Sequence, residues 1–223
     1  MYAFDLSAVS TDDFGATILE IDMIPSRRVL KTHISEIVAS LHRHDIDDLE
    51  ALRRLLKDKR GYSELATGLG VDEQYLTLLN REVNSYVTKP LPLARLERLF
   101  EEELERLATA SVTSTRHLYE RCATKSGREA LANETRIAFE RLTGVLGLCD
   151  LVRITGCGPA SARAFWDLGI RGPRDYLATD SETIQRRYAD YTEKETGRRE
   201  VLGLVDIDYC RRYCEGLSDD IER

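Results

Sequence analysis

The feature that most constrains this chain is a self-similarity at a spacing of 66 residues. Placing residues 41–86 on residues 107–152 without a gap gives eight identities over 46 positions. The identical pairs are Leu41 with Leu107, Leu52 with Leu118, Lys59 with Lys125, Gly61 with Gly127, Leu65 with Leu131, Ala66 with Ala132, Leu76 with Leu142, and Thr77 with Thr143. A helical unit with one apolar face cannot bury that face alone, so we interpret the pattern as a tandem of two helical units.

Apolar residues recur with helical periodicity through both halves of this alignment. Residues 27–41 carry them at Leu30, Ile34, Ile37, Val38 and Leu41, after a turn at residues 25–26. Further short helices are expected after residues 47–48 and after residue 72, and the Pro-rich stretch 89–92 marks a break. A charged helix over 93–108 has its apolar stripe at Leu96, Leu99, Phe100, Leu104 and Leu107. The sequence therefore predicts a mainly α fold.

Two short segments are rich in β-branched residues and predict strands. They are Ala16–Ile21 and Val201–Val205, which would form a small two-stranded element near the ends of the chain. The resulting domain boundaries are an acidic segment at 1–26, a first helical unit at 27–92, a second unit with a hairpin at 93–178, and a C-terminal helical cap at 179–223.

Residues 151–170 contain a glycine pattern between two apolar stretches. Gly156 and Gly158 permit a turn that residues with a Cβ would strain, and Pro159 suits the first position of a helix. Small alanines and the anchor Phe165–Trp166 follow. The pattern predicts two closely packed helices joined by a tight loop.

This stretch resembles a helix-hairpin-helix motif. In that family the loop presents backbone N–H groups at a helix N-terminus, so the resemblance implies contact with nucleic-acid phosphates without reading of base sequence. The binding residues implied are Arg153, Thr155, Gly156, Cys157, Gly158, Ala160, Ser161 and Arg163. Two departures favour a pure packing turn instead: Ala160 stands where DNA-binding members place Lys or Arg, and residues 89–94 of the first unit have no glycine.

A longer resemblance covers residues from about Ile24 to Cys214. Its marks are the stretches 25–28, 75–86 with 89–90, 150–154 and 203–206. They are similar to a bacterial family of helix-hairpin-helix-like proteins catalogued as a domain of unknown function (4332). The resemblance implies a helical fold and a bacterial origin, and it brings no established activity.

The net charge of −7 is concentrated at the two ends of the chain. Residues 1–26 contribute −5, residues 27–151 sum to zero, residues 152–214 give +1, and residues 215–223 give −3. A neutral body generates no long-range field that steers a protein to phosphate. This balance excludes strong, field-driven nucleic-acid binding and leaves weak, loop-mediated binding open.

The sequence offers no pattern for catalysis, a metal or a cofactor. His42 and His44 are two residues apart and do not share a helix face, and no phosphate-binding loop, nucleophile elbow or dinucleotide fingerprint is present. Five cysteines, an odd number, favour a reducing compartment over a disulfide framework. Without an apolar stretch long enough for a membrane helix or a signal peptide, we expect a cytoplasmic protein with no membrane contact.

Two functions remain open on these grounds. The first is a non-catalytic module that binds DNA or RNA weakly, through the hairpin loop and with a basic stripe at Arg53, Lys57 and Arg60 as a further phosphate contact. The second is a protein-interaction or scaffold module in which the hairpin only packs and the basic stripe is ion-paired surface. The ligand, the partner and the oligomeric state do not follow from the sequence.

Overall fold

A computed structural model describes residues 1–21, 23, 25–96 and 101–222. Its described residues are mainly helical, as predicted, and their only β-type pairings are two isolated bridges, Ser10 with Asp48 and Pro92 with Ser114. None of the helices in these residues is both long and apolar enough to cross a membrane. The chain divides into two compact units, residues 5–87 and residues 88–223 together with 1–4.

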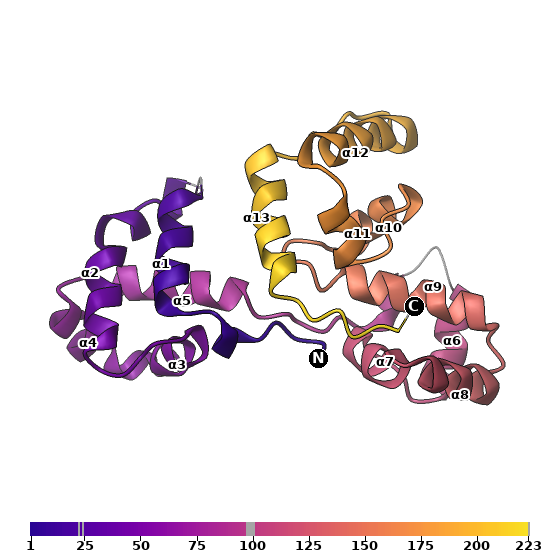
Figure 1. Cartoon of the computed structure of the whole chain (residues 1–223), viewed down its shortest axis with the longest axis horizontal. Coiled ribbons are helices and arrows are strands. Elements are labelled where there is room, and N and C mark those ends of the chain that lie inside the picture. The colour runs from indigo at the N-terminus through magenta and orange to yellow at the C-terminus, as the bar shows by residue number, and fades with distance from the viewer. Residues whose placement is uncertain (22, 24, 97–100, 223) are drawn as a thin grey trace. The chain divides into compact units, whose positions relative to one another are not determined.

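In its described residues, the unit of residues 5–87 contains five α-helices and three short 3₁₀ turns; the helices are labelled in Figure 1. The helices are α1 (Thr11–Glu20), α2 (Leu30–His42), α3 (Leu49–Leu55), α4 (Tyr62–Leu69) and α5 (Glu73–Ser85), and the turns are η1 (Leu6–Ala8), η2 (Pro25–Arg27) and η3 (Lys59–Gly61). The apolar stripe predicted for residues 27–41 is buried along α2. Asp48 and Asp72 cap α3 and α5 through their carboxylates, as the sequence indicates.

The described residues of the other unit contain η4 (Leu93–Leu96), followed by eight α-helices that are labelled in Figure 1. They are α6 (Glu101–Thr109), α7 (Thr115–Cys122), α8 (Lys125–Thr135), α9 (Phe139–Leu151), α10 (Pro159–Asp167), α11 (Pro173–Ala178), α12 (Ser181–Thr196) and α13 (Leu204–Glu215). Helix α9 packs against α7, α8 and α10, and α13 packs against α11 and α12. Leu96, Leu104 and Leu107 of the predicted stripe are buried, whereas Leu99 and Phe100 lie outside the described residues.

Helix bounds in the two units recur at the 66-residue spacing found in the sequence. Helix α5 and helix α9 begin and end 66 residues apart, and so do the N-caps of α3 and α7, which are Asp48 and Ser114. The left-handed positions recur as well: Asp45 has φ 57° and Ser111 has φ 61°, while Gly70 has φ 68° and Arg136 has φ 56°.

Backbone pairing in front of α3 and α7 is alike on the helix side, where the residues are 66 positions apart, whereas their partners are 82 positions apart. The Leu49 amide donates to the Val9 carbonyl at 3.0 Å, and the Thr115 amide donates to the Leu91 carbonyl at 2.9 Å. Each bond therefore ties a residue outside the helices to the first residue of an α-helix, Leu49 of α3 or Thr115 of α7.

The predicted strands are wrong. Residues 16–20 belong to α1, where Ser10 accepts a hydrogen bond from the Asp13 amide and Thr11, Phe14 and Ile18 are buried at helical spacing. Capping and burial outweigh the β-branched composition, which is only a weak preference. Residues 201–203 lie outside helix and strand, and residues 204–205 begin α13, so the expected two-stranded element does not form.

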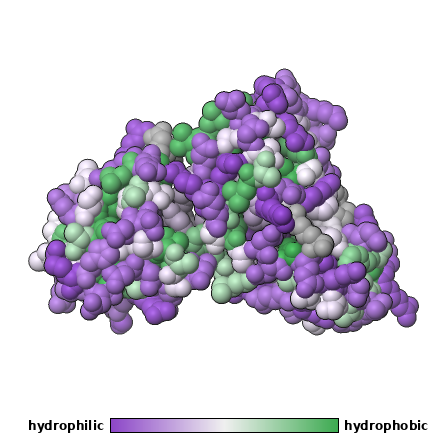
Figure 2. Space-filling model, viewed as in Figure 1, coloured by the Kyte–Doolittle hydropathy of each residue, from purple (hydrophilic) through white to green (hydrophobic). Residues whose placement is uncertain are grey.

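Hydrophilic residues predominate on the face shown in the space-filling view (Figure 2). The apolar residues left exposed are few, and three of them lie close together in sequence: Val201 (61% exposed), Leu204 (38%) and Val205 (45%). They flank the start of α13, the helix that covers the hairpin loop described next.

Candidate binding site at the glycine hairpin

The loop between α9 and α10 has the geometry that its glycines predict. Gly156 has φ 74°, in the left-handed region, and the Cys157 amide closes the turn by donating to the Ile154 carbonyl at 3.0 Å. Gly158 is extended and serves as the N-cap residue of α10, with Pro159 at the first helical position. Cys157, between the two glycines, points inward and is 9% exposed.

The N-terminus of α10 is open toward solvent. No side chain caps this helix, and a Cβ built at Gly156 or Gly158 would find no atom within 4 Å. Gly156 and Ala160 are exposed, and Ser161 is half-buried. The first amides of a helix without a cap carry partial positive charge, and they suit an anion such as a phosphate oxygen.

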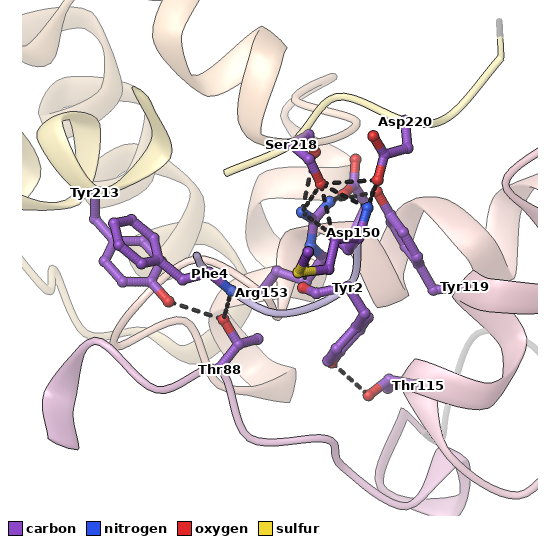
Figure 3. Close-up of polar contacts among 11 residues, drawn as sticks. Tyr2, Phe4, Thr88, Thr115, Tyr119, Asp150, Arg153, Tyr213, Ser218 and Asp220 are labelled. Carbon is purple, nitrogen blue, oxygen red and sulfur yellow. Dashed lines mark hydrogen bonds and ion pairs between the residues drawn. The ribbon is translucent and has the colours of Figure 1, made fainter. Parts of the chain in front are cut away.

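Arg153, which the hairpin resemblance places among the phosphate contacts, is not available for that role. Its guanidinium is buried, 2.6 Å from the Asp150 carboxylate and 2.8 Å from the Tyr119 hydroxyl (Figure 3). It also donates to the Tyr2 carbonyl at 2.9 Å and to the Ser218 carbonyl at 3.0 Å. This side chain fastens residues from both ends of the chain to α9. Asp150, three residues earlier and near the end of α9, is the sequence signal that could have indicated an internal ion pair.

The remaining arginine of the predicted set is also engaged. The Arg163 side chain lies along α10 and pairs with the Asp167 carboxylate at 2.9 Å. Its side chain keeps 37% of its exposure. Such a partly exposed pair within one helix is weak, so Arg163 can change partners at little free-energy cost.

The inner side of the loop faces helix α13 across a cavity of about 280 Å³. From the hairpin it is lined by Thr155, Gly156, Cys157 and Ser161, and from the other side chiefly by Leu202, Asp206, Ile207 and Cys210. The Cys210 thiol donates to the Thr155 carbonyl at 3.3 Å. Burial raises the pKa of the Cys157 thiol far above its ordinary value, so this cysteine is not a nucleophile.

The sequence did not predict the α13 side of this cavity. The order of motifs gives no indication that residues 202–210 return to the loop across some fifty intervening residues, and Cys210 alone was too weak a signal. The structure therefore brings together Thr155, Gly156, Cys157 and Ser161 on the inner side and leaves Gly158 and Ala160 at the open end of α10.

Other charged groups named from the sequence are paired in the structure. Arg53 contacts Glu50 at 3.5 Å and Arg60 contacts Asp58 at 3.0 Å, so the predicted basic stripe contains two ion pairs. His42 lies between two carboxylates, at 2.6 Å from Asp47 and 3.1 Å from Asp12. In the described part of the chain no group of three or more His, Cys, Asp or Glu is placed to hold a metal ion.

A family model described as a domain of unknown function (DUF4332) matches residues 97–215. The chain belongs to this family. The DUF4332 match covers more than half of the chain and ends with the last residue of α13. It is shorter than the resemblance expected from residue 24 onward, because residues 24–96 lie outside it. No curated protein and no solved structure matches the chain.

Proposed function

We propose that this protein is a non-catalytic module that binds the backbone of DNA or RNA, weakly and without sequence preference. The observation that carries the proposal is the open, uncapped N-terminus of α10 beside the left-handed Gly156. Backbone amides at a helix N-terminus contact phosphate oxygens and carry no information about the bases.

We further propose that α2–α5 and α6–α9 are tandem copies of one helix-hairpin-helix-like unit. The recurrence of helix bounds, N-caps and left-handed positions at one spacing supports a duplication. Only the second copy continues into a glycine loop, because the chain after α5 runs through Lys89–Pro92. The proposed site is therefore single, which agrees with weak binding.

Charge sets the expected strength of this interaction. Asp206 lines the cavity behind the loop, and Arg163 is already paired with Asp167. Few cations therefore remain to release counterions from the nucleic acid. We expect a small salt slope, corresponding to about one or two phosphate contacts.

Fluorescence anisotropy of labelled duplex DNA, single-stranded DNA and RNA across a salt series tests the proposal. Gly156→Asp places a carboxylate at the open loop and should abolish binding. Gly169→Asp is the matched control, because Gly169 is also left-handed, with φ 86°, and also has open space around it. A lack of binding at low salt, or equal loss in both variants, would falsify the proposal.

A specific observation favours a second function, a protein-interaction module. Val201, Leu204 and Val205 are exposed at the start of α13, and their neighbour Leu202 lines the 280 Å³ cavity. Clustered exposed apolar residues mark interaction sites more often than isolated ones do. If this surface binds a protein, Val205→Asp should remove a partner that the unaltered chain retains in affinity capture and leave nucleic-acid binding unchanged.

A further inference from the structure

A second cavity, of about 560 Å³, lies in the unit of residues 88–223 and is lined by α8, α9 and the end of α10. Its wall contains three basic residues and two aromatic ones, namely Lys125, Arg128, Arg171, Phe139 and Trp166. Two residues of the C-terminal tail, Ile221 and Glu222, complete the lining. The cavity thus combines positive charge with flat apolar surfaces.

The tail is held on the N-terminus of α8 by its last described residue. The Lys125 amide donates to the Glu222 carboxylate at 2.6 Å, and the Glu222 amide donates to the Ala123 carbonyl at 2.9 Å. The Arg128 guanidinium donates to the Glu222 carbonyl. A carboxylate of the chain therefore occupies the position where the N-terminal amides of a helix of 11 residues favour an anion.

Arg128 gives an independent indication that an anion belongs here. The residue is 3% exposed, and it donates to the Cys122 carbonyl at 2.8 Å while its guanidinium lies 5.6 Å from the centre of the Phe139 ring. Its Nε is buried without a hydrogen-bond partner, and within the described residues no carboxylate forms an ion pair with it. A buried cation that has only neutral acceptors is stabilised by an anionic ligand.

The acidic residues that line the cavity do not cancel this positive charge. Asp150 is paired with Arg153 at 2.6 Å, and Glu140 is exposed. On the aromatic side, the Arg171 guanidinium lies 3.9 Å from the centre of the Trp166 ring. A flat cation stacked on an indole offers a second planar surface and further N–H donors to a ligand.

We propose that this cavity binds a phosphate-bearing mononucleotide group and that Glu222 occupies its anion position in cis. The phosphate replaces the Glu222 carboxylate at the Lys125 amide, near the charge of Arg128, and the base lies against the aromatic wall. The tail, with Asp219, Asp220 and Glu222, is then an autoinhibitory segment that a ligand must displace. None of these residues belongs to the hairpin loop, so this site does not depend on the function proposed above.

Trp166 makes the proposal directly measurable, because it is the only tryptophan in the chain and it lines the cavity. Adenosine monophosphate is titrated while Trp166 fluorescence is followed, at low salt. Glu222→Gln removes the competing charge and should bind the nucleotide at least about fivefold more tightly than the unaltered chain. Glu215→Gln makes the same change of net charge at an exposed position and should leave the affinity unchanged.

Inorganic phosphate and adenosine separate the two halves of the proposed ligand. Phosphate should compete with adenosine monophosphate, and adenosine alone should bind much more weakly. Adding Lys125→Ala to Glu222→Gln leaves the Lys125 backbone amide in place but removes a basic side chain from the cavity wall, and it should reverse part of the gain in affinity. Equal nucleotide affinities of Glu222→Gln and Glu215→Gln would overturn the proposal that the Glu222 carboxylate occupies the anion position. Absence of saturable quenching in Glu222→Gln, with its helical circular dichroism intact, would overturn the site itself.

Discussion

Helices α2–α5 and α6–α9 share several helix bounds and two left-handed positions at a spacing of 66 residues, yet the chain leaves them in different ways. After α5 it continues through Tyr86–Pro92, without a glycine. After α9 it turns at Gly156 and starts α10, and the buried ion pair of Arg153 and Asp150 lies just before this turn in the chain. Apolar spacing and N-caps thus determine where the helices form. The glycine turn and the buried Arg153 determine which groups after α9 are exposed to solvent.

The largest effect should come from removing the buried charge of Arg153, which distinguishes the segment after α9 from the segment after α5. Arg153→Met leaves Asp150 buried without its partner, and breaking a buried pair from one side costs about 3–5 kcal/mol. The position 66 residues earlier is Val87, which is only half-buried. Val87→Met should change the free energy of unfolding by less than about 1.5 kcal/mol. Urea titrations followed by circular dichroism measure both variants.

A second substitution separates the buried charge from the lost packing. Adding Asp150→Leu to Arg153→Met removes the orphaned carboxylate and should recover a large part of the stability, since an apolar replacement of a whole buried pair is often neutral. Failure of the double variant to recover any stability would show that the hydrogen bonds from Arg153 to Tyr2 and Ser218 matter more than the ion pair.

The next effect concerns packing behind the hairpin. A Cβ at Gly147 would lie 2.4 Å from Cζ3 of Trp166 and 3.2 Å from the Arg171 carbonyl. Gly147→Ala should therefore destabilise the protein by about 1–3 kcal/mol and alter Trp166 fluorescence. The residue 66 positions earlier, Arg81, is exposed, and the free energy of unfolding of Arg81→Ala should lie within about 0.5 kcal/mol of that of the unaltered protein. Similar losses of stability in Gly147→Ala and Arg81→Ala would argue against a difference in packing between the two positions.

The left-handed residues after α4 and α8 allow two substitutions whose expected effects on stability have opposite signs. Gly70 has φ 68° and its counterpart Arg136 has φ 56°. Gly70→Ala introduces a Cβ where it is strained and should cost about 1 kcal/mol, whereas Arg136→Gly relieves the same strain and should stabilise by up to about 1 kcal/mol. Thermal unfolding of the two variants should therefore move Tm in opposite directions, and a shared direction would contradict equivalent turns.

The sequence predicted the helical frame because its signals are local. The stripe from Leu30 to Leu41, the caps Asp48 and Asp72, and the Pro159 helix start all reside within a few residues of the element they define. The strand expected at residues 16–21 was wrong for a related reason: β-branched composition is a weak preference, whereas the local cap at Ser10 and the helical spacing of Phe14 and Ile18 determine the structure.

The candidate site was predictable only in its loop. The residue types of Gly156 and Gly158 are enough to predict the backbone conformation of the loop. The burial of Arg153 depends instead on hydrogen bonds to Tyr2, Tyr119 and Ser218, which are far away in sequence. Long-range partners such as Cys210 at the Thr155 carbonyl likewise leave no periodic signal. Phosphate-binding potential can therefore be predicted from a motif, whereas the availability of a particular arginine requires the tertiary contacts.

The smallest effect should be a pH dependence confined to the unit of residues 5–87. Hydrogen bonds to Asp47 and then Asp12 raise the pKa of His42 above its ordinary value of 6.5, and they join the start of α1 to the end of α2. Because the folded pKa is the higher one, this stabilisation is complete below about pH 6.5 and declines as the pH rises through the folded pKa. His42 is exposed, so the effect is small.

The residue 66 positions after His42 is Ala108, which has no charge to titrate, so the comparison isolates one side chain. His42→Gln should flatten the dependence of Tm on pH between about 5.5 and 8 and leave Tm unchanged at the alkaline end, where the histidine is already neutral. Asp47→Asn should lower the pKa of His42, as measured by its ring-proton chemical shift, by more than Asp12→Asn does, because the Asp47 contact is the shorter at 2.6 Å. A His42 ring that titrates at its ordinary pKa would show that this contact does not hold the two helices together.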